Sequence, residues 1–116
     1  MRNYKELKIW QKADELASRV YSLALMFPKE ELFGLTSQVK RSALAVPANI
    51  VEGFYRGRRE FLHFLVIALS SLKETDYLLN FAVGRAHRQQ QDAQAAFVLI
   101  DELSKMISVF IKKLKG

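Results

Sequence analysis

The sequence predicts an all-α fold, an antiparallel up-and-down bundle of four helices, on three observations. The chain has 116 residues, enough for one domain spanning 1–116, and its five glycines and two prolines argue against a turn-rich β-sandwich. Apolar residues recur at three- and four-residue spacing in four long segments, which is typical of amphipathic helices. The connections between these segments are short, so consecutive helices are expected to pack as antiparallel neighbours.

The first helix is predicted over residues 5–26. Its end is set by Phe27 and Pro28, because the residue before a proline avoids the helical region. A second apolar stripe widens the apolar sector beyond what one core contact needs. The main stripe is Leu7, Trp10, Ala13, Ala17, Val20 and Ala24, and the second is Ile9, Leu16 and Leu23.

The second helix is predicted over residues 36–55, with Thr36 as its N-cap. Pro47 lies inside it and removes one backbone hydrogen bond, normally at a cost of ~3 kcal/mol. We therefore expect the helix to kink near residues 43–47 or to split into two pieces. Asn49 or a neighbouring chain is the expected partner of the carbonyl that Pro47 leaves free.

The third helix is predicted over residues 59–84 and the fourth over residues 92–114, with Asp92 as the N-cap of the fourth. Residues 61–69 are apolar almost all the way round. A helix of this kind is buried on more than one side, which in so small a domain requires a partner. The sequence therefore predicts that copies of the chain assemble into a homo-oligomer.

The composition and motifs argue against an enzyme. The absence of cysteine excludes disulfides, thiolate zinc sites and cysteine nucleophiles. Glu60 and His63 match one half of a di-iron helix motif, but the second half is missing because Gly84 stands three residues before His87. Neither a serine-nucleophile turn nor a phosphate-binding glycine loop is present. We expect no catalytic residue, no metal and no cofactor.

The apolar segments are too short for a membrane span. The longest apolar run, residues 64–69, has six residues, whereas a span needs about 20. The N-terminal residues are polar and lack the pattern of a secretory signal. We expect a cytoplasmic protein without membrane contact.

The charge balance favours an anionic partner. Eighteen Lys and Arg against twelve Asp and Glu give a net charge of +6 and a pI near 9.7. We expect two separate basic patches at opposite ends of the bundle, one at the turn after the second helix and one at the C-terminus. Arginines there can bind phosphates and an aromatic ring can stack on an unpaired base, although solvated loops are the alternative interpretation. The candidate residues are Tyr55, Arg56, Arg58 and Arg59 in the first patch and Lys112, Lys113 and Lys115 in the second.

Polar residues are interleaved with the apolar stripe of the second helix: Gln38, Arg41, Asn49 and Glu52. One interpretation is an internal hydrogen-bonded network that sets the helix register, with Glu74 as the partner of Arg41, since an unpaired buried charge costs several kcal/mol. The other is a polar pocket or a subunit contact.

The motif Val46-Pro47-Ala48-Asn49-Ile50-Val51-Glu52-Gly53, preceded by residues 27–43, resembles the four-helix-bundle family of proteins encoded in intervening sequences of 23S ribosomal RNA genes. Residues 7–13 and 61–74 fit the same pattern. The resemblance implies a left-handed antiparallel bundle that assembles into a cyclic homo-oligomer, typically a pentamer, with a positively charged surface. A relative of that family, the accessory protein of diversity-generating retroelements, binds nucleic acid and a reverse transcriptase.

Two functional hypotheses follow. The first is a non-catalytic, homo-oligomeric protein whose basic surface binds nucleic acid, either RNA or DNA. The second is a protein–protein interaction scaffold that docks a partner protein and has no nucleic-acid ligand, its charge serving solubility.

Overall fold

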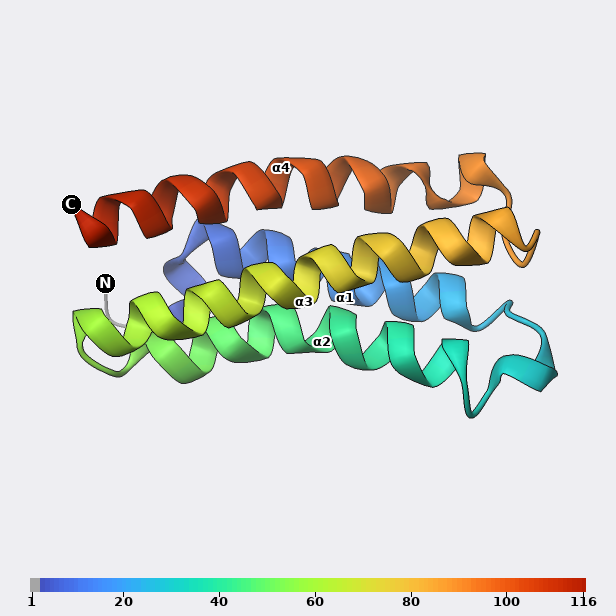
Figure 1. The fold of residues 1–116 in the computed structure, drawn as a ribbon, viewed down its shortest axis with the longest axis horizontal. Helices are drawn as coiled ribbons and strands as arrows, with labels where there is room; N and C mark the ends of the chain where they lie inside the picture. The colour runs from blue at the N-terminus through green and yellow to red at the C-terminus, as the bar shows by residue number, and fades with distance from the viewer. Residues whose placement is uncertain (1–2) are drawn as a thin grey trace.

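Four α-helices run side by side along the length of the molecule (Figure 1). The computed structural model describes residues 3–116, which span 43 × 23 × 20 Å. The described residues contain no strand, so the all-α prediction is confirmed. The elements in chain order are a 3₁₀ helix at Tyr4–Glu6, α1 at Lys8–Ala24, a 3₁₀ helix at Lys29–Glu31, α2 at Leu35–Phe54, α3 at Arg58–Gly84 and α4 at Gln90–Lys115.

Successive helices alternate in direction, as expected from their short connections (Figure 1). α1 and α3 each pack against both α2 and α4, so every helix has two neighbours. The 3₁₀ helix at Tyr4–Glu6, the α2–α3 turn and the end of α4 therefore lie at one end of the bundle, and the α1–α2 and α3–α4 connections lie at the other. In the described part of the chain, no helix is both long enough and apolar enough to cross a membrane.

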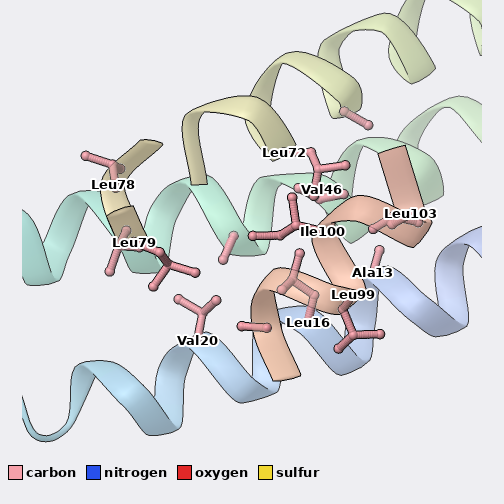
Figure 2. Close-up of a cluster of buried hydrophobic side chains, with 14 of the residues drawn as sticks. Ala13, Leu16, Val20, Val46, Leu72, Leu78, Leu79, Leu99, Ile100 and Leu103 are labelled. Atoms are coloured by element: carbon pink, nitrogen blue, oxygen red, sulfur yellow. The ribbon is translucent and has the colours of Figure 1, made fainter. Parts of the chain in front are cut away.

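The core lies between all four helices (Figure 2). Leu16 and Val20 of α1 are buried among side chains from the other three helices, including Val46 and Leu79. The second apolar stripe on α1 does not need another copy of the chain to cover it, because Ile9, Leu16 and Leu23 are all buried within the single chain. A helix with two neighbours buries two faces, and this accounts for the width of its apolar sector.

The first helix begins later than predicted, at Lys8 instead of residue 5. The Asn3 side chain accepts a hydrogen bond from the Lys5 amide at 2.8 Å and caps a separate 3₁₀ turn. Leu7 is extended and buried, and this residue divides the 3₁₀ turn from α1.

α2 runs without a break through Pro47, so it does not split into two pieces. Its N-cap residue is Gly34, and Thr36, which we expected to cap it, is buried inside the helix. The Asn49 side chain donates to the carbonyl of Ala45 at 2.8 Å. That carbonyl is not the one that Pro47 frees, which belongs to Ala43, four residues before the proline.

The α3–α4 connection also differs from the prediction. α4 begins at Gln90, so Asp92 lies in its first turn and does not cap it. α3 ends with the amide of His87 bonded to the carbonyl of Ala82, and the amide of Ala86 to that of Val83. This pair of bonds is a Schellman motif, which places Ala86 in the left-handed region with a φ of 62°.

Small side chains allow α2 and α3 to approach closely. A Cβ added to Gly53 would lie 2.7 Å from Cβ of Phe64. Further along the pair, the buried Thr75 hydroxyl lies 2.9 Å from the Ser42 hydroxyl and 2.8 Å from the Ser71 carbonyl. These two hydroxyls form the buried polar contact of the α2–α3 interface.

Candidate nucleic-acid interface

The two basic clusters predicted from the sequence lie together, at the same end of the bundle. We expected them at opposite ends, and that expectation is wrong. In an antiparallel pair, the start of one helix lies beside the end of its neighbour, so the start of α3 meets the end of α4 (Figure 1). The contact is direct, because Arg58 Nε donates a hydrogen bond to the carbonyl oxygen of Leu114 at 2.8 Å.

All of the net positive charge of the described residues lies at this end, which we call the basic end and define as residues 3–8, 52–60 and 105–116. These segments hold nine Lys and Arg against three Glu, a net charge of +6. The other described residues, 9–51 and 61–104, hold eight Lys and Arg against nine Asp and Glu, a net charge of −1. The surface potential of the molecule is therefore strongly asymmetric along its length.

Arg58 has a structural role at the basic end. Its Nε bonds the Leu114 carbonyl, and its Nη2 donates to the carbonyl of Lys113 at 3.2 Å. The last carbonyls of an α-helix lack intrahelical partners and carry the negative end of the helix dipole. The guanidinium of Arg58 therefore caps α4.

Arg56 is also engaged within the chain. Its Nη2 lies 3.1 Å from Oε2 of Glu52, and its guanidinium stands over the ring of Phe64, 5.0 Å from the ring centre. The carboxylate of Glu52 reduces the potential that Arg56 presents to an anion. Glu52 is thus a surface partner of Arg56 and not a member of an internal network.

On α3 and α4, four exposed cations of the basic end form neither an ion pair nor a side-chain hydrogen bond within the described residues: Arg59, Lys112, Lys113 and Lys115. Arg59 and Lys115, with Arg58, line a cavity of about 410 Å³ whose apolar wall is Leu62 and Leu114. Free ammonium and guanidinium groups of this kind are the groups that bind phosphate oxygens.

An aromatic cluster lies at the same end of the bundle as these cations. Tyr55, at the C-terminal end of α2, is 62% exposed and contacts Phe54 and Tyr4 edge to face, with ring centres 4.9 and 6.5 Å away. Tyr4 in turn contacts Trp10 at 4.9 Å. Single-strand binders combine exposed rings, on which unpaired bases stack, with a positively charged surface.

Lys12, on α1, lies outside this set of cations. Its Nζ is 2.8 Å from Oε1 of Glu102 on α4. The hydrogen bond to Glu102 and the charge of that carboxylate raise the pKa of the Lys12 ammonium above its usual value. The pair links α1 to α4 and leaves little free charge for a ligand.

The polar residues of α2 do not form the internal network that we considered. Gln38, Arg41, Glu52 and Glu74 are exposed, and Asn49 is half-buried on its own helix. Arg41 and Glu74 form no ion pair with each other, but both line a cavity of about 400 Å³ between α2 and α3, together with Gln38, Ser42, Ala45 and Ser71. Gln38, Arg41 and Glu74 thus share a polar cavity at the surface, and Asn49 and Glu52 lie outside it.

The acidic and histidine side chains of residues 3–116 include no group of three or more that is placed to hold a metal ion. Glu60 and His63 are both exposed on the first turns of α3. His87, in the α3–α4 connection, lies 2.9 Å from Oε2 of Glu31 in the α1–α2 connection. This contact ties together the two connections at the end opposite the basic end.

Comparison with known proteins identifies related chains. The 23S rRNA-intervening sequence protein family matches residues 5–109. Among solved structures, the chain is similar to a protein of unknown function from the S23 ribosomal protein family of Bacteroides thetaiotaomicron, with a TM-score of 0.81 and 26% sequence identity. That match covers 90% of this chain and 95% of the other. No curated protein matches the chain.

Proposed function

This chain belongs to the family of 23S rRNA-intervening sequence proteins, and we propose that it is a non-catalytic protein whose basic end binds the phosphates of a nucleic acid. The observation that supports this most directly is the concentration of charge, +6 on the basic end against −1 on the other described residues. Neutralising phosphates releases the counterions condensed on the nucleic acid, and this drives binding without a sequence-specific site.

The proposal assigns the phosphate contacts to the four unpaired cations of α3 and α4, Arg59, Lys112, Lys113 and Lys115. Arg58 and Arg56 are held by Leu114 and Glu52, so they contribute less. Tyr55 provides a ring for an unpaired base, which favours a single-stranded RNA or DNA over a duplex.

We also propose that copies of the chain form a cyclic homo-oligomer, with five as the number that the family resemblance implies. Supporting features lie on α3, where Val66, Tyr77 and Phe81 are exposed and Leu62, Phe64, Ile67 and Leu69 are only half-buried. A ring multiplies the number of basic ends, and so raises the local positive potential that an anion meets. The same apolar side chains favour the second candidate function, a scaffold that docks another protein.

A binding titration tests the nucleic-acid proposal. Fluorescence anisotropy with single-stranded RNA, single-stranded DNA and duplex probes is measured at two salt concentrations. We expect a Kd tighter than about 10⁻⁴ M that weakens as salt rises. A quadruple variant of Arg59, Lys112, Lys113 and Lys115 to Gln should abolish most of the binding. The matched control converts four exposed cations elsewhere, Arg19, Lys29, Lys73 and Arg85, to Gln. Equal loss in both variants would show that only the net charge matters, which contradicts the assignment to the basic end.

A further inference from the structure

An apolar groove lies between the start of α1 and the last turns of α4, with a volume of about 550 Å³. Lys12 of α1 pairs with Glu102 of α4, and α4 continues for thirteen residues, 103–115, beyond this pair. α1 begins at Lys8, and the 3₁₀ helix that precedes it contacts α2. The last turns of α4 therefore extend past the start of α1, and apolar side chains of both segments line the groove that results.

The lining of the groove is mostly apolar, with a small number of charged groups. Five lining residues are apolar and three are exposed lysines, and among the described residues no Asp or Glu lines the groove. Sites for small molecules have this kind of lining, and their volumes run from about 300 to 1,000 Å³. The apolar residues are Leu7, Ile9, Met106, Val109 and Phe110, and the lysines are Lys8, Lys105 and Lys113.

The small extent of the groove favours a small molecule over a protein as its occupant. Eight residues line the groove, whereas a specific protein interface uses about 20–30 residues on each side. The exposed apolar face on which the proposed ring depends belongs to α3, which lies across the bundle from α1. The groove is therefore separate from that face.

The lysines of the groove select the charge of the ligand. Lys105 is partly neutralised, because its Nζ lies 3.2 Å from Oδ2 of Asp101. Lys8 and Lys113 form no ion pair among the described residues. An ammonium group beside an apolar wall attracts an anion more strongly than one in bulk water, because the local dielectric constant is lower. A ligand that places an anionic group next to an apolar body matches both parts of the lining.

We propose that this groove binds an amphipathic carboxylate, a ligand with an extended hydrocarbon chain and one carboxylate group, such as a free fatty acid. The hydrocarbon chain packs on Met106, Val109 and Phe110, and the two unpaired lysines, Lys8 and Lys113, attract the carboxylate. The inference goes beyond the proposed function. Its test contains no nucleic acid, so its failure and the failure of nucleic-acid binding are measured separately.

Isothermal titration calorimetry of the full chain with decanoate, below its micellar concentration, tests the proposal. We expect one site per chain, with a Kd tighter than about 1 mM. Octanoate should bind about fifteenfold more weakly, because it lacks two methylenes and each buried methylene contributes a factor of about four. Decylammonium has the same chain length and the opposite charge, and it should bind at least about tenfold more weakly than decanoate.

A substitution in the groove locates the site. Val109→Asp places a carboxylate in the groove at a position that is 54% exposed, and it should weaken decanoate binding at least about tenfold. The matched control is Val98→Asp, on the same helix, 56% exposed and outside the groove. The control has the same net charge and should bind decanoate as the unsubstituted chain does. Circular dichroism should show equal helicity in the three proteins.

A second pair of variants tests the role of the lysines. Lys8→Gln combined with Lys113→Gln should weaken decanoate binding at least about fivefold and leave decylammonium binding no weaker. Lys29→Gln combined with Arg85→Gln removes the same charge from exposed positions outside the groove, and this control should leave decanoate binding nearly unchanged.

Three results would each overturn the proposal: no binding of decanoate, equal binding by the Val109→Asp chain, or equal affinity for decanoate and decylammonium. Sedimentation velocity on the same samples identifies a different occupant. If a second copy covers the groove, the unsubstituted chain should fail to bind decanoate and Val109→Asp should weaken self-association. That outcome also contradicts a carboxylate site, and the anisotropy titration would still judge nucleic-acid binding by itself.

Discussion

Arg58 at the first residue of α3 holds the carbonyl oxygen of Leu114, in the last turn of α4, through a 2.8 Å hydrogen bond. This contact joins two basic clusters that are 56 residues apart in the chain. The three arginines of the α2–α3 turn therefore have different roles. Arg58 caps α4, Arg56 pairs with Glu52, and Arg59 forms no ion pair among the described residues.

Arg58→Gln should lower the free energy of unfolding by about 1 kcal/mol, because the last carbonyls of α4 lose a charged donor. Hydrogen exchange of the amides in the last turn of α4 should become faster. Arg59→Gln is the control, since Arg59 lies next to it without a bond to α4 and its loss should change the stability by less than about 0.5 kcal/mol. Equal melting temperatures for the two variants would contradict the capping role.

Glu52→Gln should strengthen nucleic-acid binding about twofold to fivefold at low salt, because it removes a negative charge from the basic end and frees Arg56. Anisotropy titration measures the change. Glu15→Gln breaks a similar exposed pair, with Arg19 at 3.3 Å, on the middle of α1. That control should leave binding nearly unchanged, and a gain of the same size would point to total charge instead of position.

Gly53→Ala should destabilise the protein by about 1–3 kcal/mol, even though alanine favours helices. The added Cβ would meet Phe64 Cβ at 2.7 Å and Phe61 Cα at 3.3 Å, and neither is the movable end of a flexible side chain. Gly84→Ala, which meets nothing within 4 Å, is the control and should be neutral or stabilising by up to about 1 kcal/mol. Chemical denaturation of both variants distinguishes close packing from a general requirement for glycine.

Thr75→Val should cost about 1 kcal/mol, because it keeps the shape of the side chain and removes the hydroxyl that lies 2.9 Å from Ser42. Ser70→Ala, on the exposed side of the same helix, should stay within about 0.5 kcal/mol. If Thr75→Val left the midpoint of denaturation unchanged, the buried hydroxyl pair would have no net stabilising effect.

The helices could be predicted because each signal lies within one segment. The stripe from Val39 to Ile50 predicts α2 to within one residue at each end. The helix starts were less predictable, because several neighbouring residues can serve as the N-cap and a 3₁₀ turn can precede the α-helix. Gly34 is the N-cap of α2 where Thr36 was expected, and the extended Leu7 divides a 3₁₀ turn from α1.

The candidate site, too, was predictable only in part. Its cations were recognisable in the sequence as clusters of charge, but the groups that they contact were not. Arg58 bonds a carbonyl 56 residues away in the chain, and Arg56 pairs with Glu52 on the preceding turn. The buried hydroxyls of Ser42 and Thr75 were missed, although small polar residues within an apolar stripe are a usable signal. Arg41 and Glu52 attracted attention by their charge, yet both point to the surface.

The amino-acid sequence by itself determined the all-α class, the four helices and the net charge, because periodicity and composition are properties of the chain. Only the tertiary structure decided that the basic clusters form one surface, that Arg58 is committed to α4, and that the wide apolar sector of α1 is buried within one copy. The physical reason is that charge and hydrophobicity are properties of each residue by itself, whereas proximity and burial depend on which helices pack against each other.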